Sequence, residues 1–263
     1  MAFHIAGVCV NGYDTPSMSS FTESAFTALQ LIVTPDPTLL AIVARSLAVS
    51  ATACAMACAL GLLLGAWLGV ARFAGRTVWL AVLNTFLAIP SVVVGLVVYL
   101  LLSRSGPLGF LGWLFSFQAM VLAQSLLVLP VVMALTRQVV EDAENSHGEQ
   151  LRSLGAGPLV RSLLLAWDER YALLTVVIAS FGRAISEVGA VMIVGGNIDG
   201  FTRVMTTAIA LETSKGDLPL ALGLGLVLLG VVLLLNGLIT ALRYWREQTE
   251  GGALRVATVG AAP

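Results

Sequence analysis

The chain has 263 residues, of which 58% are hydrophobic and 11% are charged, against about 45–50% and about 25% in an average soluble domain. This composition indicates an integral membrane protein and excludes a disordered chain, which needs low hydrophobicity and high net charge. The 14 basic and 15 acidic residues give a net charge of −1, which excludes a nucleic-acid-binding protein that relies on bulk positive charge.

The first apolar segment, Phe21–Val33, is too short to cross a membrane, which takes about 20 residues. It ends before Pro35, and we expect it to be an interfacial helix. No basic residue precedes it, so the pattern does not predict a cleaved signal peptide. Residues 1–17 fit no expected segment, and Met18 is an alternative start of translation.

Five membrane-spanning helices are expected to follow. Four windows contain no Asp, Glu, Lys or Arg: Ser46–Ala71, Thr77–Ser103, Ser105–Thr136 and Leu218–Leu242. The fifth window, Tyr171–Val194, contains Arg183 and Glu187, which lie four residues apart on one helical face and can neutralise each other. We expect this pair to be a gate or a structural contact, because charged residues inside a span are tolerated when they pair with each other.

Small residues and prolines predict how these helices pack. Gly61, Gly65 and Gly69 have the four-residue spacing that lets a second helix approach closely. Pro90 and Pro130 each remove an intrahelical hydrogen bond, so we expect kinks at these positions.

The distribution of basic residues predicts the orientation in the membrane. Nine arginines lie in the loops of one side: Arg72, Arg76, Arg137, Arg152, Arg161, Arg170, Arg243, Arg246 and Arg255. The other side carries only Arg45, Arg104, Arg203 and Lys215. We therefore expect the C-terminus and the loop at 141–170 in the cytoplasm, and the N-terminus outside.

The polar loop at 141–170 is expected to be structured. Ser146 and Glu149 have the spacing of a capping box, which predicts a short helix that ends at Gly155. Pro158 suits the first turn of a second helix.

This loop carries a first resemblance to a known family. Residues 149–155 read E-Q-L-R-S-L-G, which resembles the E-A-A-x-x-x-G loop of permease subunits in ATP-binding-cassette (ABC) importers, where a coupling helix sits on the ATPase. The match is partial, since Gln150 and Leu151 replace the two alanines. The resemblance implies that the following residues contact the ATPase: Glu149, Leu151, Leu154, Gly155 and Ala156.

A second resemblance covers most of the chain between Met18 and Arg246. The run from Ser186 to Asp217 is similar to permeases of tungstate importers and, more distantly, to those of molybdate importers, and residues 84–96 and 103–109 agree. It implies an all-α, five-helix permease of the type I importer fold in a bacterial inner membrane. The implied partners are a second copy of the chain, two ATPases and an extracytoplasmic solute-binding protein.

The expected domain organisation follows from both patterns. An N-terminal tail and interfacial helix occupy residues 1–38, the permease domain residues 39–246, and a cytoplasmic tail residues 247–263.

Tungstate is a tetrahedral dianion at neutral pH. A path for it therefore needs hydrogen-bond donors that replace its hydration shell without holding the ion too firmly. The candidate donors are hydroxyls and a turn of bare backbone N–H groups: Ser91, Ser180, Ser186, Gly195, Gly196 and Asn197. Each serine has the alternative of bonding its own helix backbone, and the glycine pair that of a plain helix C-cap. The outer segment from 199 to 217 is expected to form an interfacial helix that meets the binding protein through Asp199, Arg203, Thr206, Glu212 and Lys215.

Other functions remain open at this stage. No G-x-x-x-x-G-K-[ST] loop occurs, so no cofactor is expected and ATP must be bound by a partner subunit. A membrane-embedded enzyme is disfavoured because His4 and His147 lie outside the spans and no aspartate lies inside one. A molybdate permease and a secondary transporter that uses Arg183 and Glu187 as an ion site are the alternatives.

Overall fold

The computed structural model describes the backbone of residues 37–259 and the side chains of residues 37–241 and 244, and in this part it contains helices and no strand. The elements are α2 (Pro37–Val70), α3 (Arg76–Ala88), α4 (Ser91–Leu102), the 3₁₀ helix η1 (Gly109–Leu111), α5 (Phe117–Ser153), α6 (Pro158–Asp168), α7 (Arg170–Ile185), α8 (Gly189–Gly195), α9 (Met205–Lys215) and α10 (Leu218–Val259). The expected all-α class is confirmed. The expected interfacial helix at 21–33 lies outside the described residues.

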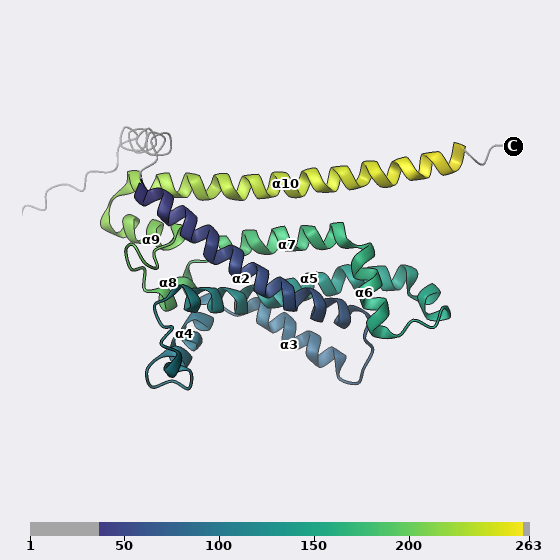
Figure 1. Ribbon diagram of the computed structural model, residues 1–263, viewed down its shortest axis with the longest axis horizontal. Helices are drawn as coiled ribbons and strands as arrows, with labels where there is room; N and C mark the ends of the chain where they lie inside the picture. Colours follow the sequence, from purple (N-terminus) through teal and green to yellow (C-terminus); the bar gives the residue numbers. More distant parts are fainter. Residues whose placement is uncertain (1–36, 260–263) are drawn as a thin grey trace, which may run out of the picture.

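The long helices α2 and α5 form the most extensive helix pair of the bundle (Figure 1). The expected glycine ladder produces this contact. A Cβ at Gly65 would lie 2.7 Å from the carbonyl oxygen of Met133 and 2.8 Å from the Cβ of Thr136. Gly61 and Gly69 meet Val132 and Val140 in the same way, so the two backbones approach as closely as small residues allow.

Two of the expected spans are broken rather than straight. α3 and α4 meet at an angle of 95°, at Ile89 and Pro90, which confirms the expected kink at Pro90. α7 and α8 meet at 57° around Glu187. Among the residues that the structure describes, three helices are long and apolar enough to cross a membrane, or up to five if each bent pair is one span.

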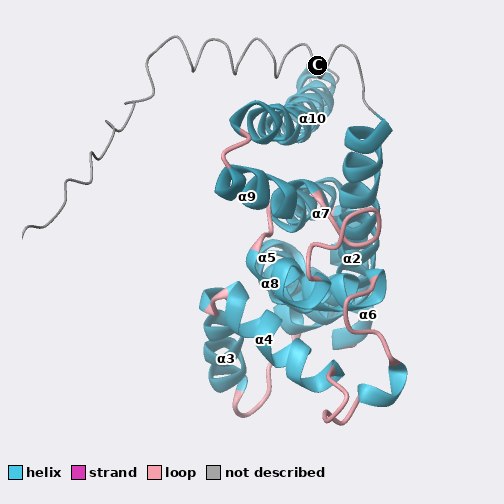
Figure 2. Cartoon of the chain, turned by 90° about the vertical axis from the view of Figure 1, so that its left-hand side faces the viewer, coloured by secondary structure: helices cyan, strands magenta, loops and turns pink. Residues whose placement is uncertain are grey.

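The bundle has two ends, which face opposite ways along its long axis (Figure 1). The loop end comprises residues 141–170, with the last turns of α5 and all of α6. The turn end comprises residues 195–217, which include the turn that follows α8 and the whole of α9. Viewed from the turn end, α9 lies beneath α10, and α3 and α4 lie on the opposite side of the bundle (Figure 2). α10 packs on α7 and α9.

The boundaries of the helices at the loop end differ from the expectation. α5 continues through Pro130 and ends only at Ser153, so no separate helix begins at Ser146. The Ser146 hydroxyl donates to the carbonyl oxygen of Asp142, four residues back, instead of capping a helix. The capping-box prediction was wrong. The stop at Gly155, with φ +79, and the start at Pro158 are confirmed.

Candidate functional site

Glu187 occupies the break between α7 and α8. Its side chain is 5% exposed, and its Oε2 accepts a hydrogen bond of 2.9 Å from Nη1 of Arg183, which confirms the expected pair. Its Oε1 accepts from the backbone N–H of Ala190, the second residue of α8, at 3.3 Å. The carboxylate therefore bonds to groups on both sides of the break.

Two further helices meet at the same residue. The hydroxyl of Ser91, the first residue of α4, lies beside the Glu187 carboxylate. The hydroxyl of Thr206, on α9, donates to the backbone carbonyl of Glu187 at 2.8 Å. Glu187 thus joins α4, α7, α8 and α9 through polar contacts, an arrangement that would transmit a movement of one of them to the others.

The three candidate pathway serines lie in different environments. Ser91 is half-buried beside Glu187, whereas Ser186 is exposed and donates to the carbonyl oxygen of Arg183. Ser180 is fully buried on α7, and its hydroxyl has no partner among the described residues. The structure therefore brings Ser91, but not Ser180, into contact with the ion pair.

A buried amide that the sequence reasoning missed lies near Ser180. Gln124 of α5 is 3% exposed, and its Nε2 donates to the carbonyl oxygen of Ala184, one helical turn beyond Ser180. Its Oε1 has no partner among the described residues. An amide inside a charge-free window was the available signal, since buried polar groups in a span are costly unless they are bonded.

The Gly195–Asn197 turn packs closely against Phe115 and Met120. A Cβ at Gly195 would lie 2.8 Å from Sδ of Met120, and one at Gly196 would lie 2.8 Å from the ring of Phe115. The Gly196 N–H donates to the carbonyl oxygen of Met192, and Gly196 has φ +68. The Gly196 N–H therefore caps the end of α8 and is not free to bind an anion.

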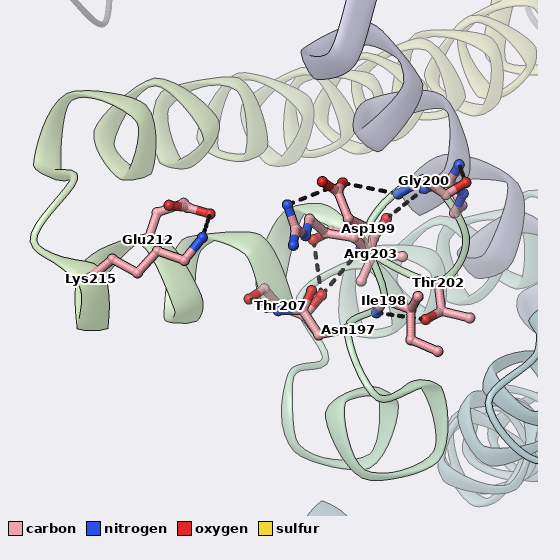
Figure 3. Close-up of polar contacts among 11 residues, drawn as sticks. Asn197, Ile198, Asp199, Gly200, Thr202, Arg203, Thr207, Glu212 and Lys215 are labelled. Atoms are coloured by element: carbon pink, nitrogen blue, oxygen red, sulfur yellow. Dashed lines mark hydrogen bonds and ion pairs between the residues drawn. The ribbon is translucent and has the colours of Figure 1, made fainter.

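Asn197 and Thr202 hold the turn end together (Figure 3). The Asn197 Nδ2 donates to the carbonyl oxygen of Thr207, while the Ile198 N–H donates to the Thr202 hydroxyl. The Asn197 Oδ1 is buried without a partner among the described residues. The turn is thus fixed by its own side chains.

The five residues expected to meet a binding protein divide into surface and interior positions. Asp199 is exposed and pairs with Arg203 at 3.1 Å, and Lys215 pairs with Glu212 at 3.0 Å (Figure 3). Thr206 and Glu212 are buried. Thr206 in particular is committed to Glu187, so its side chain does not lie on the outer surface, contrary to the expectation.

Arg45 of α2 clamps the turn from the other side. Its guanidinium donates to the carbonyl oxygens of Gly200, at 2.7 Å, and Arg203, at 3.3 Å. A cation that bonds two loop carbonyls fixes the position of Asp199 and Arg203 relative to the first span.

Two carboxylates organise the loop end. Glu141 of α5 pairs with Arg72, Arg76 and Arg137. Glu144, which is 2% exposed, pairs with Arg152 and Arg161. Because Arg161 lies on α6, the second cluster fixes α6 to the end of α5.

The exposed face of α6 is apolar. Leu165 is buried against α2 and α5, whereas Leu163 is 50% and Trp167 is 73% exposed. The other exposed apolar residues of this face and the adjoining turn are Leu154, Leu159, Val160 and Leu164. The sequence predicts a second helix from Pro158, but the expected contact at 149–156 did not include this exposed apolar face, although its apolar residues recur at helical spacing.

The residues expected at 149–156 surround the turn that precedes α6. Glu149, Leu154 and Gly155 are exposed, whereas Leu151 and Ala156 are half-buried. The Ala156 N–H donates to the carbonyl oxygen of Leu151 at 3.0 Å. This turn presents Leu154 beside the apolar face of α6.

Comparison with known proteins identifies the family. No family model matches the chain. It is 42% identical to the tungstate uptake system permease of Peptoclostridium acidaminophilum, over 86% of this chain and 99% of the relative. It is 43% identical to a probable anion ABC transporter permease of Haloferax volcanii, over 81% of this chain and 93% of the relative. A sulfate transport permease of Escherichia coli is 31% identical over 62% of each chain. The chain therefore belongs to the family of ABC transporter permeases that includes the tungstate uptake permeases.

Proposed function

We propose that this chain is the membrane permease of a tungstate importer driven by a separate ATPase. The supporting observation is the 42% identity to a tungstate uptake permease along 99% of its length, against 31% over 62% for the sulfate permease of Escherichia coli. As a permease subunit of an ABC uptake system, the chain is not itself an enzyme. Molybdate has the same charge and nearly the same size, so it is the competing cargo.

The apolar face of α6 is the proposed seat of the ATPase. Its exposed leucines and Trp167 lie at the loop end, on a helix too short to cross the membrane. A cluster of large exposed apolar side chains outside a membrane indicates a protein contact. Leu154 and the exposed Glu149 extend this surface to the turn before α6.

The ion pair Arg183–Glu187 is the proposed gate latch. Arg183 is 50% exposed while Glu187 is buried, so the guanidinium faces accessible space and its charge is largely neutralised. A neutralised cation with neighbouring hydroxyls offers weak donors to a dianion, which suits passage better than tight binding. Ser91, beside Glu187, and Ser186, whose hydroxyl donates to the backbone carbonyl of Arg183, complete the proposed path.

We propose that two copies of the chain form this path between them, with the loop end in the cytoplasm. The excess of arginine on that side supports the orientation. The proposed contact with the extracytoplasmic binding protein is then at the turn end, through the exposed Asp199 and Lys215, with Arg203 fixed between Asp199 and Arg45.

Metal accumulation in cells tests the cargo and the ATPase contact together. Tungsten and molybdenum are measured by mass spectrometry in cells given nanomolar oxyanion. The strains carry a deletion, the wild-type gene, Leu163→Asp or Glu149→Lys. Asn145→Asp, which adds the same charge to an exposed position of α5 outside the apolar face, is the control for Leu163→Asp.

We expect the deletion strain to lose tungsten accumulation but not molybdenum accumulation. Leu163→Asp and Glu149→Lys should lower tungsten accumulation at least tenfold, whereas Asn145→Asp should leave it near the wild-type level. If the deletion lowered molybdenum as much as tungsten, the cargo would not be tungstate alone. Uptake by the purified chain in vesicles with an ion gradient and no ATPase would instead establish a secondary transporter.

A further inference from the structure

An apolar groove lies between α2, α3 and α5 on the side of the bundle away from α10. It has a volume of about 530 Å³. Each of the three helices contributes one face to its lining, at a spacing of three or four residues. The lining residues are Leu64, Trp67 and Leu68 of α2, Phe73, Trp79, Val82, Leu83 and Phe86 of the loop and α3, and Leu126, Leu129, Pro130 and Met133 of α5.

The groove exists because α3 turns away from the bundle axis. The 95° angle between α3 and α4 makes α3 run obliquely to α5 (Figure 1). The side chains of α3 therefore reach α5 without filling the space that α2 and α5 leave between them. Val82 and Phe86 remain 41% and 52% exposed.

A cluster of arginines lies at the loop end of this groove. Arg72 and Arg76 flank Phe73, and Arg137 lies one turn of α5 beyond Met133. All three pair with the single carboxylate of Glu141. Three guanidinium groups against one carboxylate leave the cluster with a formal charge of +2.

Part of this charge is available to a ligand. The Arg72 side chain is 57% exposed, and its Nη1 lies 3.7 Å from Oε1 of Glu141, which is beyond hydrogen-bond range. The Arg76 side chain is only 15% exposed and is already bonded to Glu141 and to the carbonyl oxygen of Leu68. The cluster thus offers one exposed cation, Arg72, beside an apolar surface.

Aromatic rings mark the boundary between the two regions. Trp67 and Phe73 stack with their ring centroids 5.6 Å apart, and Trp79 is 64% exposed. Tryptophan is enriched where membrane hydrocarbon meets the head groups. The arginines would then lie at head-group level and the groove at the level of the acyl chains.

We propose that this groove binds one anionic phospholipid, whose phosphate contacts Arg72 and one of whose acyl chains lies between α3 and α5. A lipid fits both halves of the site, because the lining is apolar while the end carries an excess positive charge. A protein segment would have to supply an acidic group and a long apolar stretch at the same place. Basic pockets between membrane helices are typical sites for anionic head groups.

Native mass spectrometry of the full-length protein in detergent tests the proposal. The protein is titrated with palmitoyl-oleoyl phosphatidylglycerol and, separately, with the phosphatidylcholine of the same chains. We expect a single bound phosphatidylglycerol and weaker binding of phosphatidylcholine. Arg72→Gln is expected to weaken phosphatidylglycerol binding about fivefold, since one arginine contributes about 1 kcal/mol at an anionic surface.

Matched variants separate the site from general effects. Arg170→Gln removes an exposed arginine at the same end but away from the groove, and should bind as wild type. Leu64→Trp fills the groove, whereas Leu63→Trp adds the same ring to an exposed neighbour that does not line it. We expect binding to fall only in Leu64→Trp.

Two results would overturn the proposal. One is equal binding of both lipids with no effect of Arg72→Gln or Leu64→Trp. The other is occupation of the groove by a second copy, shown by an intermolecular disulfide in membranes of a Val82→Cys variant in a background without the native cysteines. Wild-type melting temperatures of the Arg72 and Leu64 variants in detergent would show that lost binding is not lost folding.

Discussion

At the scale of single residues, Glu187 illustrates how a costly group is tolerated inside a span. A charged residue in the middle of a membrane helix costs about 2.5–3.5 kcal/mol on insertion scales. Here the break between α7 and α8 supplies the Ala190 N–H as a donor, and Arg183 supplies a countercharge. The break thus provides a donor that a continuous helix would use internally, and the carboxylate holds the break in place.

Glu187→Gln should lower both transport and stability. The amide can still accept from the Ala190 N–H but loses the charge that binds Arg183, and a hydrogen bond to a charged group contributes about 1.5–3 kcal/mol. We expect a lower melting temperature in detergent and reduced tungsten uptake. Asp142→Asn, at an exposed position of α5, is the control. Unchanged uptake and melting in the Glu187 variant would contradict the latch.

Gly65→Ala should destabilise the α2–α5 pair. The added Cβ would lie 2.7 Å from the Met133 carbonyl oxygen, so the helices must separate, and overpacking of this kind costs about 1–3 kcal/mol. The control is Gly230→Ala in α10, where a Cβ meets nothing within 4 Å. Thermal unfolding of both purified variants measures the difference, and similar melting temperatures would refute the close-packing argument.

At the scale of elements, the sequence predicts features that depend on local stereochemistry. Gly155 ends α5, Pro158 begins α6 and Pro90 breaks the second window because each position has a backbone requirement of its own. Ser146 failed as a helix start, because a hydroxyl can equally bond the carbonyl four residues back and the flanking residues continue the helix.

Contacts between distant segments could not be predicted in this way. From the sequence, Gly195 and Gly196 were expected to form a turn with free backbone N–H donors. In the structure, their lack of side chains lets Met120 and Phe115 pack against the backbone at these positions. The pairing of Glu144 with Arg161 depends on how α6 folds back on α5. Such contacts are set by packing, which no spacing rule encodes.

Glu144→Gln should loosen α6. The buried Glu144 carboxylate forms ion pairs with Arg152 and Arg161. Removing one partner of a buried ion pair lowers the stability of the fold by about 3–5 kcal/mol. We expect faster amide hydrogen exchange across residues 148–165, measured by mass spectrometry, and unchanged exchange in α2. The control Asp142→Asn should leave hydrogen exchange at the wild-type rate both in residues 148–165 and in α2. Protection of α6 in the Glu144 variant equal to wild type would show that its apolar anchor Leu165 suffices.

At the scale of the whole molecule, the two broken helix pairs decide how many times the chain crosses the membrane. The 95° angle between α3 and α4 fits either one bent span or a re-entrant loop. For α7 and α8 the same question matters for function. These two helices connect α6 to α9, so only a crossing by this pair puts α6 and α9 on opposite sides. Glu187, which bonds to α9, then lies between the proposed ATPase surface and the proposed binding-protein surface.

Cysteine labelling of intact cells distinguishes the two topologies. In a background without native cysteines, Ala74→Cys reports the loop before α3, Ser105→Cys the loop after α4, Ser146→Cys the loop end and Gly200→Cys the turn end, all at exposed positions. With five crossings, we expect a membrane-impermeant maleimide to label Ser105→Cys and Gly200→Cys, and to label the other two only after permeabilisation. Labelling of Ala74→Cys and Ser105→Cys from the same side would make α3 and α4 a re-entrant loop. That result would contradict the structure, because α2 and α5 pack in parallel, with Gly61 at Val132 and Gly69 at Val140, and because Arg72 and Arg76 pair with Glu141 of α5. A re-entrant loop would put these partners on opposite sides of the membrane.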